Sequence, residues 1–195
     1  MKNESEIIAR DTESYLPVFS RYPIVLDHGE GSYVWDVNGR KYLDALGGIA
    51  VNVLGHNYAP LVDAIAEQAK RLIHVSNLYY TEPQADAAAK LSALTAGGKV
   101  FFGNSGAEAN EGAIKAARKY AHTIHSEKSQ IITALGSFHG RTLATLTATG
   151  QEKFHKGFEP LPQGFDYVSF NDIAALEAQM SENTAAVMLE PIQGE

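Results

Sequence analysis

The stretch KVFFGNSGAEANEGAIKAARKYA, residues 99–121, predicts a strand, a tight turn and a helix in succession. KVFF at 99–102 has the β-branched and aromatic residues of a buried strand, and Gly103 permits a tight turn after it. From Gly106 onward, small side chains recur at helical spacing, as in a helix that packs closely on a sheet. This strand-to-helix unit is typical of α/β folds.

The same alternation continues along the chain. We expect strands at 131–135, 166–170 and 185–189, with helices after Gly140 and Asn171. Such alternation builds a mostly parallel sheet covered by helices, which is the predicted fold class. A parallel strand at 185–189 needs a covering helix that these residues do not supply, so we expect the chain to be the front part of a larger protein.

Upstream of this region the pattern is different. SYVWDVNGRKYLDAL, residues 32–46, places strand-forming residues on both sides of Asn38-Gly39, which predicts a small antiparallel meander. A helix is expected after Pro60, and another from Thr81, with Gln84 completing a capping box. We therefore expect a segment of a small domain over 1–46 and the first part of a large domain over 47–195.

Composition excludes several classes of protein. The chain has 195 residues, a formal net charge of −7 and no cysteine, so disulfide scaffolds, thiolate nucleophiles and general nucleic-acid surfaces are not expected. The N-terminus is too polar for a signal peptide, and the longest apolar stretch is too short to cross a membrane. His122 and His125 lack carboxylate support, so no metal site is expected. We predict a cytoplasmic protein.

Ligands of open α/β sheets bind beyond the carboxyl ends of the strands, where three segments carry candidate residues. In FGNSGAEANEG, residues 102–112, Ser105 and Gly106 begin a helix whose free N–H groups and dipole favour a phosphate. The alternative is that Ser105 and Glu108 only cap the helix.

The second segment is GSFHGRT, residues 136–142. Phe138 is a possible stacking platform, His139 a possible acid or base, and Arg141 a possible anion ligand. Core packing, a structural histidine and a solvated arginine are the respective alternatives. The third segment, EPIQGE, places Glu190 and Glu195 at the same edge, either to hold cationic groups or as solvated acids. The connection 150–164 is long enough to expect a functional role.

Taken in order, FFGNSGAEANEGAIKAARKYA, FHGRT and LEPIQGE resemble the pyridoxal-phosphate-dependent class III aminotransferases of fold type I. The resemblance extends upstream to YVWDVNGRKYLDALGGIAV. It implies pyridoxal 5'-phosphate as cofactor, with Ser105, Gly106 and Ala107 around the phosphate, Phe138 stacked on the ring beside His139, and Glu190 near the ring's polar edge. It also implies that Arg141 binds the substrate carboxylate, that Glu195 holds a later arginine, and that Tyr80 lines the substrate channel.

The activity that the resemblance implies is transamination between a small amino acid and 2-oxoglutarate in a homodimer. N2-acetylornithine is the expected amino donor, and ornithine, succinylornithine and 4-aminobutyrate are alternatives. The family's Schiff-base lysine and pyridinium aspartate are expected outside this sequence, so we expect the 195 residues alone to be inactive. A non-catalytic binding or assembly module remains the alternative from another class.

Overall fold

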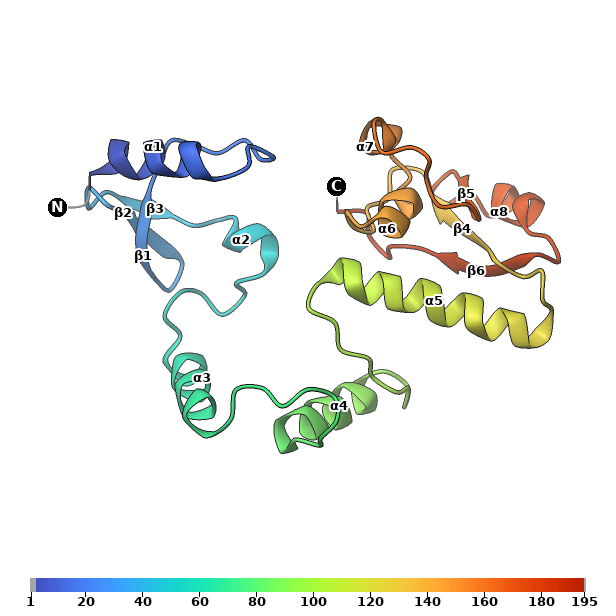
Figure 1. The fold of residues 1–195 in the computed structure, drawn as a ribbon, viewed down its shortest axis with the longest axis horizontal. Helices are drawn as coiled ribbons and strands as arrows, with labels where there is room; N and C mark the ends of the chain where they lie inside the picture. The colour runs from blue at the N-terminus through green and yellow to red at the C-terminus, as the bar shows by residue number, and fades with distance from the viewer. Residues whose placement is uncertain (1–2, 195) are drawn as a thin grey trace. The chain divides into compact units, whose positions relative to one another are not determined.

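The computed structural model describes residues 3–194 and divides into two compact units, Met1–Tyr80 and Thr81–Glu195 (Figure 1). The first unit contains an antiparallel sheet and the second a parallel sheet. The expected division into a small and a large domain at residue 46 stays a prediction.

The first unit contains a three-stranded meander in the order β1-β2-β3, as the sequence predicted. The turn at Asn38-Gly39 joins β2 to β3, and Gly39 takes a positive φ of 81° that suits glycine. Asp36 holds this turn, because its carboxylate accepts hydrogen bonds from the Tyr42 hydroxyl at 2.7 Å and from the Asn38 and Arg40 N–H groups at 2.9 Å. The helices and strands of the unit are α1 (Glu4–Ser14), β1 (Leu26–Glu30), β2 (Tyr33–Asp36), β3 (Lys41–Leu43), α2 (Gly47–Ala50) and α3 (Ala59–Arg71).

The short element α2 is a turn in the left-handed region of backbone space. Its four residues have φ between 56° and 66°, and two of them, Ile49 and Ala50, are not glycine. Asp44 anchors the entry to this turn by accepting from the N–H groups of Leu46 and Gly47, and its other oxygen lies 2.8 Å from His56 Nε2. The bond to His56 lowers the pKa of Asp44 below its usual value.

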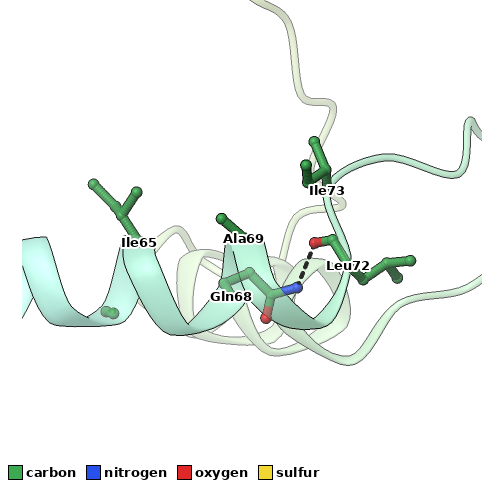
Figure 2. A pocket seen from close by; sticks show the side chains of 6 residues that line it. Ile65, Gln68, Ala69, Leu72 and Ile73 are labelled. Atoms are coloured by element: carbon green, nitrogen blue, oxygen red, sulfur yellow. Dashed lines mark hydrogen bonds between the residues drawn. The ribbon is translucent and has the colours of Figure 1, made fainter.

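Helix α3 has an exposed apolar side. Ile65 and Ala69 lie one turn apart on this side, and Ile73 follows just after the end of the helix (Figure 2). Gln68 lies beside them and donates to the Leu72 carbonyl at 2.8 Å. Ile65 and Ile73 are 61% and 86% exposed, so no described residue of the first unit covers this side.

The second unit contains a parallel sheet in the order β5-β4-β6, which confirms the predicted fold class. Its core forms where Ile114 of α5, Ile131 of β4 and Ala148 of α6 pack together. Figure 1 shows the long helix α5 running beside this sheet. The helices and strands of the unit are α4 (Glu82–Leu94), α5 (Gly106–Ile124), β4 (Gln130–Ala134), α6 (Leu143–Ala148), α7 (Glu152–His155), β5 (Phe165–Val168), α8 (Ile173–Gln179) and β6 (Thr184–Met188).

Two local predictions were wrong. Residues 99–102 are not a strand, because neither β4, β5 nor β6 pairs with them and extended chain becomes a strand only beside a neighbour. The Phe101 ring packs instead on α5, where an added Cβ at Gly112 would lie 2.8 Å from it. Thr81 does precede α4, but its side chain makes no capping hydrogen bond, and the exposed first turn is left to water.

None of the helices within residues 3–194 has the length and apolar character that a membrane span requires.

Candidate functional site

The structure brings together the three segments that carry the predicted site residues: the first turns of α5, the turn after β4 and the segment after β6. Asn110 of α5 donates its Nδ2 hydrogen to the His139 carbonyl at 2.7 Å. Glu190, after β6, accepts from the Phe138 N–H at 3.0 Å, and Gln193 donates to the Leu135 carbonyl at 2.9 Å. The carboxyl edge of the parallel sheet is therefore one cluster of residues that lie far apart in the sequence.

The first part of this cluster is the start of α5. Ser105 is the N-cap, and its hydroxyl accepts from the Glu108 N–H at 3.2 Å. The N–H groups of Gly106 and Ala107 have no hydrogen-bond partner among the described residues. A Cβ added at Gly106 would meet nothing within 4 Å, so the backbone is open to an approaching group at this point. Two free donors at the positive end of a 19-residue helix favour an anion here.

The predicted capping box forms only in part. The Ser105 hydroxyl caps the helix, but the Glu108 carboxylate accepts from the N–H of Asn104 at 2.5 Å rather than from that of Ser105. Glu108 therefore holds the residue before the cap and leaves the two open N–H groups of α5 unoccupied by a side chain.

The second part of the cluster is the turn 136–142, which carries Phe138, His139 and Arg141. Gly140 brings this turn against α5, because a Cβ at Gly140 would lie 2.9 Å from the Cβ of Ala107. Phe138 is half-buried, and its ring meets the ring of Phe154 edge to face at 6.4 Å. An aromatic ring and the helix N-terminus are thus part of the same site.

His139 is buried, with 5% of its surface exposed, and its Nε2 atom has no hydrogen-bond partner. Burial lowers the pKa of His139, and the nearby Glu190 carboxylate opposes this shift. The ring is therefore held mainly in its neutral form at neutral pH. The role of His139 as an acid or base stays a prediction.

Arg141 is exposed, and its guanidinium lies 4.3 Å from the centre of the Phe154 ring and 5.5 Å from that of Phe138. No carboxylate of the described residues pairs with it. The two aromatic rings hold the cation in place through cation–π contacts while its donors remain available to an anion.

Phe154 was not among the predicted site residues. It lies on α7, inside the connection 150–164 whose length and composition predicted a functional role. Nothing in the sequence pattern distinguished this phenylalanine from its neighbour Phe158, so only the folded structure selects it.

Of the three remaining predicted site residues, one lies in the cluster at the carboxyl edge of the sheet and two do not lie among its described residues. Glu190 is half-buried and belongs to the cluster through its bond to Phe138. Tyr80 lies in the first unit and its side chain is fully exposed. Glu195 lies outside the described residues.

A cavity of about 470 Å³ opens beside the cluster. It is lined by three polar residues, Asn110, His139 and Glu190, and by Phe138. The rest of its wall comes from apolar residues of α5, of β4, and of β6 and the segment that follows it. An apolar cavity with a few convergent polar groups is the usual form of a small-molecule site.

Comparison with known proteins identifies the family. The sequence model described as aminotransferase class III matches residues 16–195. The chain belongs to the class III aminotransferases. Acetylornithine aminotransferase of Caldanaerobacter subterraneus subsp. tengcongensis is 56% identical over 190 residues, which are 97% of this chain and 48% of that protein. The chain thus spans about half the length of the curated relatives it matches.

Solved structures of this family agree with the fold. Ornithine aminotransferase from Toxoplasma gondii ME49 has a TM-score of 0.93 at 30% identity, over 100% of this chain and 47% of that one. Acetylornithine aminotransferase from Elizabethkingia anophelis has a TM-score of 0.81 at 32% identity, over 100% and 46% of the two chains. Class III aminotransferases are fold type I enzymes that depend on pyridoxal phosphate.

The residues of this class III chain fit that cofactor. The free N–H groups of Gly106 and Ala107 match a dianionic phosphate. Phe138 supplies an aromatic face, and His139 lines the same cavity. The donors and the aromatic face lie on neighbouring segments, because Ala107 and Gly140 are in contact distance.

Proposed function

We propose that the protein containing this chain transfers the δ-amino group of N2-acetylornithine to 2-oxoglutarate, as a step of arginine biosynthesis. The observation that supports the donor is the set of curated relatives: eight of them, at 50% to 57% identity, are each named acetylornithine aminotransferase. Ornithine is the second candidate donor, because a structure of high similarity is an ornithine aminotransferase.

In this proposal the start of α5 binds the cofactor phosphate through Ser105, Gly106 and Ala107. The two open N–H groups and the helix dipole support this role. Phe138 contacts the face of the ring, His139 lies beside it and Glu190 lies near its polar edge. When bound, pyridoxal phosphate would supply an aldehyde that takes up the amino group and an electron-withdrawing ring that stabilises the carbanion.

The substrate side of the proposal rests on Arg141. Its guanidinium is unpaired, exposed and fixed over two aromatic rings, which suits bidentate binding of the donor's α-carboxylate. Tyr80 would line the substrate channel, and Glu195 would hold an arginine of the whole protein. We further propose that the whole protein is a cytoplasmic homodimer.

The test uses the protein expressed from its natural reading frame and measures glutamate formation from 2-oxoglutarate with four donors. We expect the highest kcat/KM with N2-acetylornithine, followed by ornithine, succinylornithine and 4-aminobutyrate. A higher kcat/KM with any of these other three donors would refute the proposed donor.

A second measurement tests the role of Arg141. Arg141→Ala should raise the KM for the amino donor by roughly ten- to a thousandfold, because it removes a charge-assisted bond to the carboxylate. Cofactor binding, followed by its visible absorbance, should change much less. An unchanged donor KM would exclude Arg141 as the carboxylate ligand.

A further inference from the structure

The turn 136–142 is irregular backbone that is nevertheless largely buried. Ser137, His139 and Gly140 are all buried, although the turn is part of neither β4 nor α6. Buried backbone N–H and C=O groups need partners, and a turn without a ladder or helix must find them elsewhere. The N–H groups of Gly136 and Ser137 bond to backbone carbonyls, whereas the N–H groups of Phe138 and His139 bond to side chains of other segments.

Two side chains of other segments hold His139, the residue after Phe138. The Oγ1 of Thr149, at the end of α6, accepts from the His139 N–H at 2.9 Å. The Nδ2 of Asn110, on α5, donates to the His139 carbonyl at 2.7 Å. The peptide groups on both sides of the His139 Cα are therefore fixed, one from each of two helices.

The Thr149 hydroxyl is itself fixed. It is fully buried and donates to the Thr145 carbonyl at 2.9 Å, so its lone pair points to the His139 N–H. A valine has nearly the same shape but has no hydroxyl, and so offers neither an acceptor nor a donor. A Thr149→Val substitution thus keeps the packing of the side chain but removes two hydrogen bonds, the one from the His139 N–H and the one to the Thr145 carbonyl. The second bond is of the same kind as the bond from the Thr147 hydroxyl to the Leu143 carbonyl.

We propose that Thr149 and Asn110 are positioning residues, which act on substrate and cofactor through the His139 peptides. Phe138 precedes these peptides and Arg141 follows Gly140 after them, so rotation at His139 displaces the aromatic ring and the guanidinium relative to each other. The backbone at Gly140 is closely packed, since a Cβ there would lie 2.5 Å from the Thr145 hydroxyl oxygen. The inference rests on the proposed function in so far as Arg141 binds the donor.

The first test needs neither cofactor nor activity. Amide hydrogen exchange of the cofactor-free protein should become faster across residues 137–141 in Thr149→Val and remain as in the wild type in Thr149→Ser. Thr147→Val is the matched control, because Thr147 is also buried on α6 but its hydroxyl bonds only to the Leu143 carbonyl. Unchanged exchange in Thr149→Val would overturn the proposal, whether or not the protein is a transaminase.

The second test measures kinetics. Thr149→Val should raise the donor KM by roughly ten- to a hundredfold, because small misplacements of a binding group have effects of this size. Thr149→Ser should restore the wild-type KM, and Thr147→Val should leave it unchanged. In an Arg141→Ala background, Thr149→Val should add less than about a twofold change, since both act through one group.

An equal rise of KM in both backgrounds would show that Thr149 does not act through Arg141, and would overturn this part of the proposal. If Thr149→Val fails to fold, the same measurements are made on Asn110→Leu. This substitution removes the hydrogen-bond donor to the His139 carbonyl, and Asn110 is only half-buried. The kinetic arms use whichever donor the wild-type protein accepts, so a wrong donor assignment and a wrong positioning role give different results.

Discussion

Ser105 has two roles at the start of α5 that one substitution can separate. As N-cap it stabilises the helix, and as a phosphate ligand it stabilises the bound cofactor. Ser105→Asp keeps a good cap and adds a negative charge that the helix dipole favours, so the unfolding free energy of the cofactor-free protein should stay within about 0.5 kcal/mol. The same charge repels a phosphate, so cofactor affinity should fall by about tenfold or more.

The measurements are urea unfolding of the cofactor-free protein and titration with pyridoxal phosphate followed by absorbance. Ser105→Ala serves as the complement, because it removes the cap at a cost of about 1 kcal/mol without adding charge. If Ser105→Asp bound the cofactor as tightly as the wild type, the phosphate would have to lie elsewhere.

At the scale of elements, the β2–β3 hairpin depends on the ionised form of Asp36. The Tyr42 hydroxyl, and with it the N–H groups of Arg40 and Asn38, lowers the pKa of Asp36 below its ordinary value of 3.8. The folded state thus binds this proton less readily than the unfolded state. The stabilisation is fully present above pH 3.8 and is lost as the pH falls through the lowered pKa of the folded protein.

We therefore expect the free energy of unfolding, measured at the hairpin, to fall between pH 5 and pH 2.5. The fall should be larger in the wild type than in Asp36→Asn. The fluorescence of Trp35, the only tryptophan of the chain, reports on β2 during urea unfolding at each pH. Asp63→Asn, a substitution on the exposed surface of α3, should retain the full pH dependence. Equal pH dependence in the wild type and Asp36→Asn would refute this role.

Elements also differ in how well the sequence predicted them. The hairpin, the three parallel strands and helices α3 to α6 and α8 occur where periodicity and turn residues indicated them. The segment 99–102 has equally strong strand propensity but is no strand, because propensity supplies no hydrogen-bond partner. The capping signal at Thr81 placed the start of α4 correctly, but the predicted side-chain hydrogen bond does not form.

At the scale of the whole molecule, the exposed apolar side of α3 should behave as a binding surface for small apolar dyes. An exposed patch of this kind binds anilinonaphthalene sulfonate, so the 195-residue chain should enhance the fluorescence of this dye. Ile65→Glu should reduce the enhancement while changing the unfolding free energy by less than about 0.5 kcal/mol, because Ile65 is 61% exposed.

Arg71→Gln is the matched control for this prediction. It changes the net charge by the same amount as Ile65→Glu, but it leaves the apolar side of α3 intact. If both variants reduced dye fluorescence equally, the effect would be one of charge and the patch would not be the binding surface.

The sequence by itself determined the fold class, the family and the segments that carry the site. Periodicity, turn residues and motif order are local properties, so they can be recognised in the amino-acid sequence without the folded structure. It also indicated that the connection 150–164 has a functional role. Only the tertiary structure decided that Phe154 lies under Arg141, that Glu190 holds the Phe138 N–H, and that Thr149 and Asn110 hold His139. These contacts join residues from separate elements, and their partners are set by how strands and helices pack, which no local pattern encodes.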